Sequence, residues 1–179
     1  EPQLRLYEKV AVAGRPEIID MEAYRHKFDR LATPARFARA EEIGQPASLN
    51  FGDRLLLRGV DLLESAGAGH LLPVTVYWEV LSPMDTRYRA FVHLVDAQGD
   101  RVAQHDDDPA CRLLTTDMRP GQRASRQFRL PLPVDIAPGR YNVVLGVYHP
   151  ETLARLDIWD NLNQQSPGNS VILGQVQVQ

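Results

Sequence analysis

Cysteine is almost absent from this chain of 179 residues, since Cys111 is the single one. The chain therefore cannot close an internal disulfide, and its fold must rest on the packing of apolar side chains. A catalytic thiolate needs an activating base, and the sequence offers only His105, six residues earlier. We expect Cys111 to be a small, partly buried apolar residue.

Long hydrophobic runs and an excess of basic residues are also missing. No stretch approaches the roughly 20 apolar residues of a membrane helix, so we expect no direct membrane insertion by this segment. Lys and Arg number 20 against 23 Asp and Glu, for a net charge of -3. This balance gives no reason to expect a nucleic-acid partner, because phosphate contacts require a basic surface. The sequence begins at Glu1 without an initiator Met, which suggests a piece of a longer protein.

Sequence signatures of the common enzyme classes are absent as well. There is no H-E-x-x-H or paired C-x-x-C spacing for zinc, no G-x-S-x-G elbow and no phosphate-binding G-x-x-x-x-G-K-[ST] loop. Gly67-Ala68-Gly69 begins like a dinucleotide fingerprint, but Leu72 stands at the third glycine position. We therefore expect no enzymatic activity from this chain and no cofactor.

What the sequence does contain is a succession of β patterns from Asn50 onward. Val74, Val76, Trp78 and Val80 alternate with polar residues, as in a half-buried strand. Further strands are predicted at 54–63, 87–95, 101–105, 125–132, 140–148, 153–159 and 171–178, with a bulge at Gly59 in the first of them. Seven or eight short strands separated by turn residues are typical of an all-β sandwich.

A local motif narrows the type of sandwich. Ile136-Ala137-Pro138-Gly139-Arg140-Tyr141 has the form of a tyrosine corner, in which the tyrosine hydroxyl bonds an upstream backbone group. Trp78 lies in the middle of a predicted strand and is a natural core anchor. We therefore predict an Ig-like, Greek-key β-sandwich.

The first 48 residues follow a different pattern and are predicted to form a partly helical N-terminal arm. Residues 4–12 favour an edge strand, and an amphipathic helix is predicted over 20–31, with Asp20 as its N-cap. Residues 35–48 are predicted to form a short helical turn and a linker. The predicted division is thus an arm at 1–48 and a sandwich at 49–179; the role of the 20–31 helix stays open.

The most conspicuous polar cluster is His105-Asp106-Asp107-Asp108-Pro109. Asp106 and Asp108 would project to one side of an extended chain, as calcium ligands do, but Ala110 and the lack of a following glycine do not fit a calcium loop. A hydrolase reading would require these carboxylates to converge with His93 or His70 in a cleft. We favour a solvated loop at one end of the sandwich, and expect His93, in an apolar strand, to be a core or interface histidine.

Exposed aromatic rings would indicate a sugar-binding platform. The candidates are Tyr77, Tyr148, His149 and Trp159. Tyr77 points away from Trp78, and Trp159 begins a polar loop where its ring would be reachable. Against this, aromatic residues make up only 7% of the chain, and most of them pack in sandwich cores.

Several motifs, taken in order, resemble a recurrent domain of bacterial membrane proteins, as in the Chloroflexi. They are Asn50-Phe51-Gly52-Asp53 with Leu56-Leu57-Arg58-Gly59-Val60-Asp61, Leu72-Pro73-Val74-Thr75-Val76-Tyr77-Trp78, Phe91-Val92-His93-Leu94-Val95-Asp96, Pro138-Gly139-Arg140-Tyr141 and Leu145-Gly146-Val147-Tyr148-His149-Pro150-Glu151-Thr152. The resemblance covers residues 49–178. In that family the domain is the C-terminal, extracytoplasmic portion of multi-pass glycosyltransferases similar to dolichyl-phosphate-mannose mannosyltransferases. His149 departs from the family, which often has Asp before the proline.

The resemblance implies a non-catalytic accessory domain on the extracytoplasmic side of a bacterial membrane, with the membrane-embedded part of its parent protein as partner. No catalytic residue carries over. Two alternatives remain open: a carbohydrate-binding module using Tyr77, Tyr148 or Trp159, and a hydrolase centred on His105 and Asp106–Asp108.

Overall fold

The computed structural model describes residues 43–111, 113–160 and 164–179, and these form ten strands. Eight strands have seven residues or more and two have only two. In chain order they are β1 (Gln45–Phe51), β2 (Leu55–Leu62), β3 (Ser65–Ala66), β4 (Leu71–Val80), β5 (Arg89–Val95), β6 (Arg101–Asp107), β7 (Arg123–Pro131), β8 (Gly139–Tyr148), β9 (Ile158–Trp159) and β10 (Val171–Val178). Two short 3₁₀ turns, η2 (Thr115–Asp117) and η3 (Pro167–Asn169), interrupt the longer connections.

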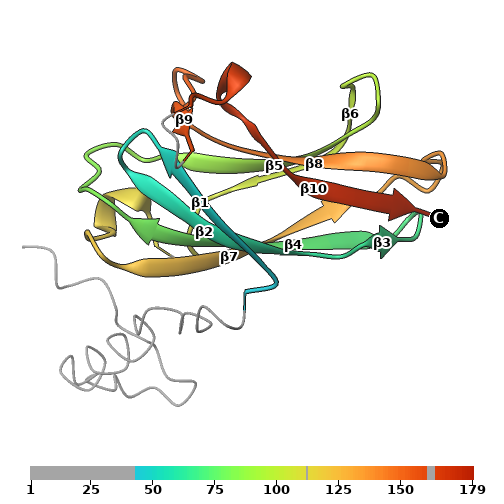
Figure 1. Cartoon of the computed structure of the whole chain (residues 1–179), viewed down its shortest axis with the longest axis horizontal. Coiled ribbons are helices and arrows are strands. Elements are labelled where there is room, and N and C mark those ends of the chain that lie inside the picture. Colours follow the sequence, from blue (N-terminus) through green and yellow to red (C-terminus); the bar gives the residue numbers. More distant parts are fainter. Residues whose placement is uncertain (1–42, 112, 161–163) are drawn as a thin grey trace, which may run out of the picture. The chain divides into compact units, whose positions relative to one another are not determined.

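The strands form two sheets that pack face to face (Figure 1). One sheet has the order β7-β4-β2-β1-β9, and the other has the order β3-β10-β8-β5-β6. All pairings are antiparallel except that of β3 with the end of β10. The predicted all-β sandwich is confirmed; its immunoglobulin-like, Greek-key subtype stays a prediction.

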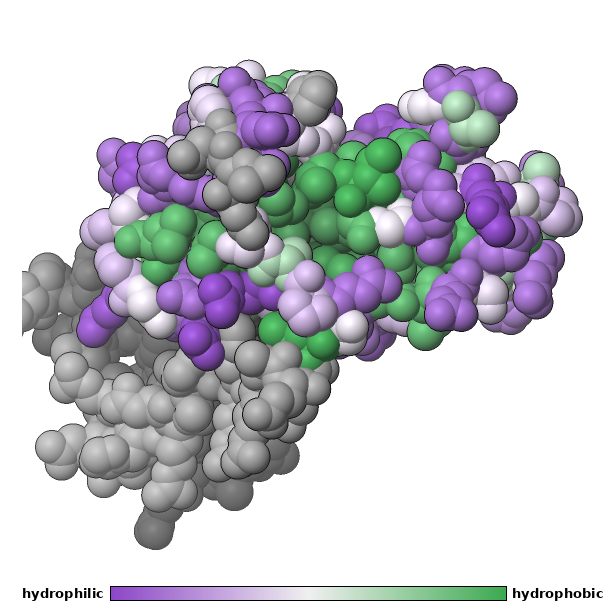
Figure 2. All heavy atoms as spheres, viewed as in Figure 1, coloured by the Kyte–Doolittle hydropathy of each residue, from purple (hydrophilic) through white to green (hydrophobic). Residues whose placement is uncertain are grey.

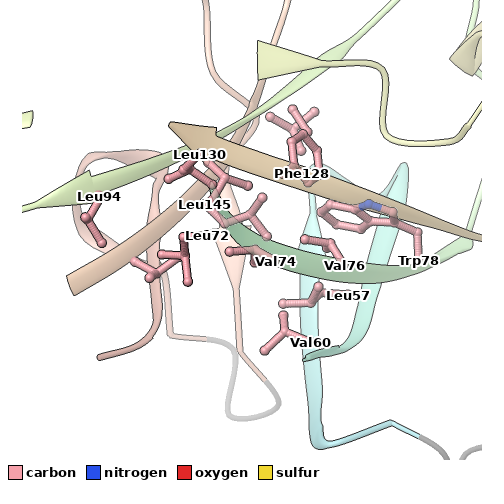
Figure 3. Close-up of a cluster of buried hydrophobic side chains, with 14 of the residues drawn as sticks. Leu57, Val60, Leu72, Val74, Val76, Trp78, Leu94, Phe128, Leu130 and Leu145 are labelled. Carbon is pink, nitrogen blue, oxygen red and sulfur yellow. The ribbon is translucent and has the colours of Figure 1, made fainter. Parts of the chain in front are cut away.

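The core lies between the sheets because one side of each long strand is apolar. Trp78 is fully buried, as predicted, and the Phe51 ring meets it edge to face at 5.1 Å between centroids. Val74 and Val76 from the same strand and Phe128 from the neighbouring edge strand β7 belong to the same core cluster (Figure 3). The core is thus built from the period-2 pattern read in the sequence.

The tyrosine corner is confirmed by its hydrogen bond. The Tyr141 hydroxyl at the start of β8 donates to the carbonyl oxygen of Ala137 at 2.8 Å. The bond fixes the loop that carries the chain from β7 in one sheet to β8 in the other.

The predicted bulge at Gly59 is also confirmed, since the register of β2 shifts between Leu57 and Gly59. Gly59 has a φ of 155°, and a Cβ atom there would overlap Ile43 and the carbonyl oxygen of Gln45. The glycine therefore allows the start of β1 to cross closely over β2. β1 begins at Gln45, inside the segment predicted as a linker through residue 48. Pro46 does not prevent this, because the β1–β2 register is irregular between Pro46 and Leu49.

The predicted edge strand at 4–12 and helix at 20–31 lie outside the described residues. Within the part of the chain that is described, no helix is long and apolar enough to cross a membrane.

On the side of the sandwich where β1 and β10 lie, apolar side chains are visible between the sheets (Figure 2). Leu49, Leu62, Val171 and Leu173 are partly buried and pack against the core. Gly174 in β10 brings the two sheets close here, because a Cβ atom at this position would lie 2.9 Å from Leu62 Cδ2. This side is therefore closed by core packing, in contrast to the polar contacts between β6 and β7 described below.

Candidate functional site

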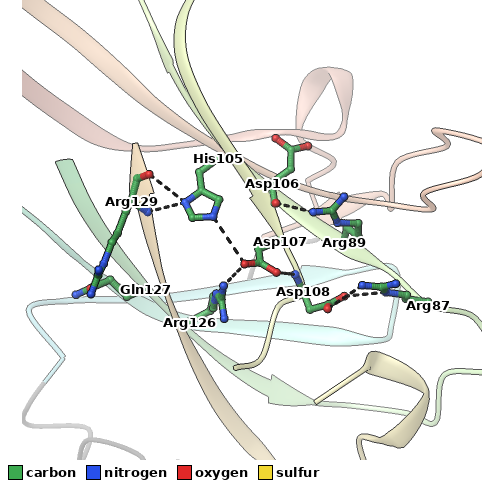
Figure 4. A network of polar contacts seen from close by, with 9 residues as sticks. All are labelled: Arg87, Arg89, His105, Asp106, Asp107, Asp108, Arg126, Gln127 and Arg129. Atoms are coloured by element: carbon green, nitrogen blue, oxygen red, sulfur yellow. Dashed lines mark hydrogen bonds and ion pairs between the residues drawn. The ribbon is translucent and has the colours of Figure 1, made fainter. Parts of the chain in front are cut away.

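The three consecutive aspartates do not lie in a solvated loop, as we had predicted, but at the end of β6 and just beyond it. β6 continues through Asp107 because it pairs with β5, with Asp106 opposite Phe91 and Asp107 opposite Ala90. Alternation along the strand sends Asp106 and Asp107 to opposite sides of the sheet (Figure 4). Each carboxylate meets different basic or hydroxyl partners, so their mutual repulsion is relieved separately.

Asp107 and His105 point toward the other sheet and connect β6 to β7. Asp107 accepts a hydrogen bond from the Arg126 guanidinium and lies 3.7 Å from His105 Nε2. The backbone N–H of Arg129 donates to His105 Nδ1 at 2.8 Å (Figure 4). These contacts join the edges of the two sheets, so the role of His105 and Asp107 here is structural.

Asp108 belongs to a third set of contacts. Its two carboxylate oxygens accept hydrogen bonds from Arg87 Nε and Nη2, both at 2.9 Å. This is the bidentate geometry that guanidinium groups favour. A cation at Asp108 would have to displace Arg87.

The remaining carboxylate, Asp106, lies on the outer face of the β3-β10-β8-β5-β6 sheet, within a group of side chains that we call the His93 cluster. The cluster consists of Arg89, Phe91 and His93 from β5, Asp106 from β6, Tyr148 from β8, and Arg155 from the segment after β8. Buried Ala90, Val92 and Leu94 alternate with the β5 members of the cluster and face the core. The sheet order β8-β5-β6 places the three strands side by side.

Gly146 makes room for the aromatic part of the cluster. It is paired with Phe91, and a Cβ atom there would overlap the Phe91 ring. His93 stacks on Phe91 with centroids 4.4 Å apart, and the Arg155 guanidinium carbon lies 4.8 Å from the Phe91 centroid. Phe91 is only 3% exposed, so it supports its neighbours and is not itself a contact surface.

Asp106 is the centre of the polar part. Its Oδ2 accepts a hydrogen bond from the Tyr148 hydroxyl at 3.0 Å, and its backbone carbonyl accepts one from Arg89 Nη2 at 2.6 Å. Asp106 Oδ1 lies 3.7 Å from His93 Nε2. Among the described residues, this buried oxygen and Arg89 Nε have no hydrogen-bond partner. The cluster thus combines an unpaired acceptor with an unpaired donor, which is costly unless a partner is supplied.

Two members of the cluster titrate abnormally. Burial lowers the pKa of His93, and Arg101 and Arg155 act in the same direction, while Asp106 opposes them. Burial and the hydrogen bond to Asp106 raise the pKa of Tyr148. At neutral pH the cluster therefore holds a neutral imidazole and a protonated phenol beside one carboxylate.

The other predicted site residues lie elsewhere. Tyr77 does point away from Trp78, but the residue is buried, with 8% exposed, and its hydroxyl donates to Asp61 at 2.6 Å. This corrects our expectation of an open stacking ring. Trp159 is 37% exposed on β9, in the other sheet from Tyr148, so the predicted rings do not form one platform.

Two further expectations are corrected. Cys111 is exposed rather than partly buried. His93, expected to be a core or interface histidine, lies on the outer face beside a carboxylate and not in the core, and its place in an interface stays a prediction. Among the described residues, Asp106 is the only one of the three aspartates whose carboxylate lies within 3.7 Å of His93 Nε2. The same residues contain no group of three or more His, Cys, Asp or Glu side chains arranged to hold a metal ion.

Sequence reasoning did not find Arg89, Phe91 or Arg155. Arg89 and Phe91 could have been found from the sequence, because residues 89, 91 and 93 alternate along the strand with apolar neighbours that face the core. Arg155 had none, because it reaches the cluster through a turn in which the N–H of His149 donates to the carbonyl of Ala154.

Comparison with known proteins gives a structural match only. No protein-family model matches the chain, and no curated protein matches it in sequence. The crystal structure of the C-terminal domain of Wzt is similar in fold, with a TM-score of 0.50 and 10% sequence identity over 79% of this chain and 89% of that chain. At this identity the similarity concerns the fold alone.

Proposed function

We propose that this sandwich is a non-catalytic carbohydrate-binding module that serves as an accessory domain of a larger protein. The observation that carries the proposal is the His93 cluster, in which a carboxylate, two guanidinium groups, an imidazole and a phenol gather on one outer face. Such a combination suits a polyhydroxyl ligand, because each sugar hydroxyl both donates and accepts hydrogen bonds.

The proposed contacts follow from exposure within the cluster. Tyr148 and His93 are partly exposed, and Arg155 is exposed, whereas Phe91 is covered. Tyr148 and His93 would offer ring edges and faces to a pyranose, and Asp106 and Arg155 would bond its hydroxyls. Asp106 Oδ1 has almost no accessible surface and lies 3.7 Å from His93 Nε2, so a sugar can contact this oxygen only if a neighbouring side chain moves.

The arrangement of carboxylates does not favour the hydrolase alternative. Glycoside hydrolysis uses two carboxyl groups that face each other across the scissile bond. Asp106 alone belongs to the cluster, while Asp107 and Asp108 are paired with Arg126 and Arg87.

The proposed setting remains the one that the sequence resemblance suggests: an extracytoplasmic domain attached to a membrane-embedded, glycosyltransferase-like parent. The fold match supports an accessory role only in the sense that a similar sandwich serves as the C-terminal domain of Wzt. Hydrophobic helices encoded upstream of Glu1 in the intact gene would support this setting, and a full-length product without them would refute it.

A glycan array probed with the folded domain, followed by calorimetric titration of each hit, tests the proposed function. We expect Tyr148→Ala to weaken binding about tenfold or more, because it removes a ring contact and the hydrogen bond that orients Asp106. Trp159→Ala is the matched control and should leave binding unchanged. Absence of binding to any glycan would contradict the proposal, and loss of binding only in Trp159→Ala would place the site elsewhere.

A further inference from the structure

The surroundings of the His93 cluster are basic, although the chain as a whole carries a net charge of -3. The charges of Arg101 and Arg155 lower the pKa of His93, and the charge of Arg89 lowers the pKa of Tyr148. Among the described residues, Asp106 is the one carboxylate that affects the pKa of His93 or of Tyr148. Arg155 lies over the Phe91 ring, Arg89 bonds the Asp106 backbone carbonyl, and Arg101 is close enough to act on His93.

Where Arg89 and Arg155 form hydrogen bonds in the described part of the chain, the acceptors are backbone carbonyls and not carboxylates. Arg89 donates to the backbone carbonyl of Asp106, and Arg155 donates to that of Gly168 at 3.1 Å. Arg101, Arg89 and Arg155 form no ion pair with a carboxylate among the residues described. Elsewhere on the molecule arginines do pair with carboxylates: Arg58 and Arg123 with Glu79, Arg87 with Asp108, and Arg126 with Asp107.

We propose that the glycan bound at the His93 cluster is anionic, and that Arg155, with Arg101 and Arg89, selects it by pairing with its acidic groups. This inference rests on the proposed function and specifies its ligand class. The shared chemistry is a sugar oxyanion, either the carboxylate of a uronic acid or a sulfate ester. A guanidinium group can donate two parallel N–H bonds to either oxyanion, the planar carboxylate or the tetrahedral sulfate.

The position of Arg155 favours this role. Its guanidinium lies over the Phe91 ring at 4.8 Å and its side chain is exposed, so it is held in place and still open to a ligand. Asp106 lies on the β6 side of Phe91 and repels an anion there. We therefore expect the acidic group to lie against Arg155 and Arg101, with the neutral part of the sugar nearer Tyr148.

Polygalacturonate and its fully methyl-esterified form provide a matched test, because they share a backbone and differ in charge. Titration calorimetry should show at least tenfold tighter binding of the acid form in 50 mM salt, and this difference should shrink in 300 mM salt. Dextran sulfate against dextran is the parallel pair for sulfate. Tighter binding of the charged member in either pair supports the inference and identifies its acidic group.

Arg155→Gln should weaken binding of the charged polymer at least fivefold more than it weakens binding of the neutral counterpart, because only the charged polymer loses an ion pair. Arg140→Gln, an exposed arginine at the far end of β8, is the matched control and should have no effect. Arg155→Lys keeps the positive charge but lacks the paired N–H donors of the guanidinium group. If its circular dichroism spectrum shows intact folding, its affinity for the charged polymer should lie between those of the wild type and Arg155→Gln.

The outcomes separate the two proposals. Equal affinity for charged and neutral polymers, or equal losses in Arg155→Gln and Arg140→Gln, would overturn the anionic ligand and leave a carbohydrate-binding module in place. Binding to none of these polymers and to no glycan on the array would overturn both.

Discussion

Single residues on β6 differ in role because the strand has two faces. Asp106 and Asp107 are neighbours in sequence, yet one bonds Tyr148 on the outer face and the other pairs with Arg126 between the sheets. A run of three aspartates therefore contributes to three separate contact sets. From the sequence we favoured a solvated loop for this run, with a metal site or a hydrolase site as alternatives.

The abnormal pKa of His93 predicts a pH dependence of stability. Burial lowers the pKa of His93 in the folded state below its ordinary value of 6.5. Between those two pKa values the unfolded chain binds a proton that the folded chain does not, so the free energy of unfolding falls as pH decreases below about 6.5. The loss ends once the pH is below the folded pKa.

Urea unfolding of the wild type and His93→Gln at pH 7.5 and pH 5 measures this contribution. We expect the wild type to lose more stability than the variant between the two pH values, because glutamine does not titrate. An equal loss in both proteins would show that His93 makes no contribution, and would contradict the burial argument.

Gly59 supports a second prediction at the residue scale. Gly59→Ala should lower the free energy of unfolding by about 2 kcal/mol or more, because the new Cβ overlaps Ile43 and the Gln45 carbonyl. Gly99→Ala is the control, since Gly99 has a φ of 89° and open space around it. It should cost only about 1 kcal/mol, from backbone strain. Similar losses in both variants would mean that crowding at the β1–β2 crossing is unimportant.

At the scale of elements, β6 and β7 are the facing edges of the two sheets and are joined by side chains. Arg126 reaches Asp107, and His105 accepts the backbone N–H of Arg129. These contacts cover edge strands whose backbone groups would otherwise be available to other chains.

A double-mutant cycle with Asp107→Asn and Arg126→Gln tests this link. We expect a coupling energy of about 0.5–1 kcal/mol in urea unfolding, since both side chains are partly exposed and the pair is screened by water. Arg87→Gln with Asp107→Asn is the control cycle and should show no coupling beyond error. No coupling in the Asp107–Arg126 cycle would remove the ion pair from the account of how the edges are held.

Strands were the best predicted elements, and β6 shows where prediction ended. The alternation of Val74, Val76 and Trp78 is enough to predict a half-buried strand from the local sequence. The strand predicted at 171–178 likewise has the bounds of β10. β6 was expected to end at residue 105, because a run of aspartates is typical of a loop. It extends to Asp107 because β5 pairs with it and Arg126 compensates its charge, and that partner lies 19 residues away in sequence.

At the scale of the whole molecule, the sandwich follows from strand periodicity and the tyrosine corner, but the His93 cluster does not. Tyr148 was expected to be accessible and Asp106 to be a candidate ligand. The Tyr148 hydroxyl lies 3.0 Å from Asp106 Oδ2 because the sheet order β8-β5-β6 brings together residues that are 42 positions apart in sequence. Local sequence pattern carries no information on that order.

The central claim is that carbohydrate binds on the outer face of β5, β6 and β8. The most direct test is a titration of the isotopically labelled domain with a glycan identified on the array, followed by amide chemical shifts. The account predicts the largest shifts at residues 89–93, 104–106 and 146–155. Shifts confined to the region of Trp159 and β9, or to the opposite sheet, would contradict it.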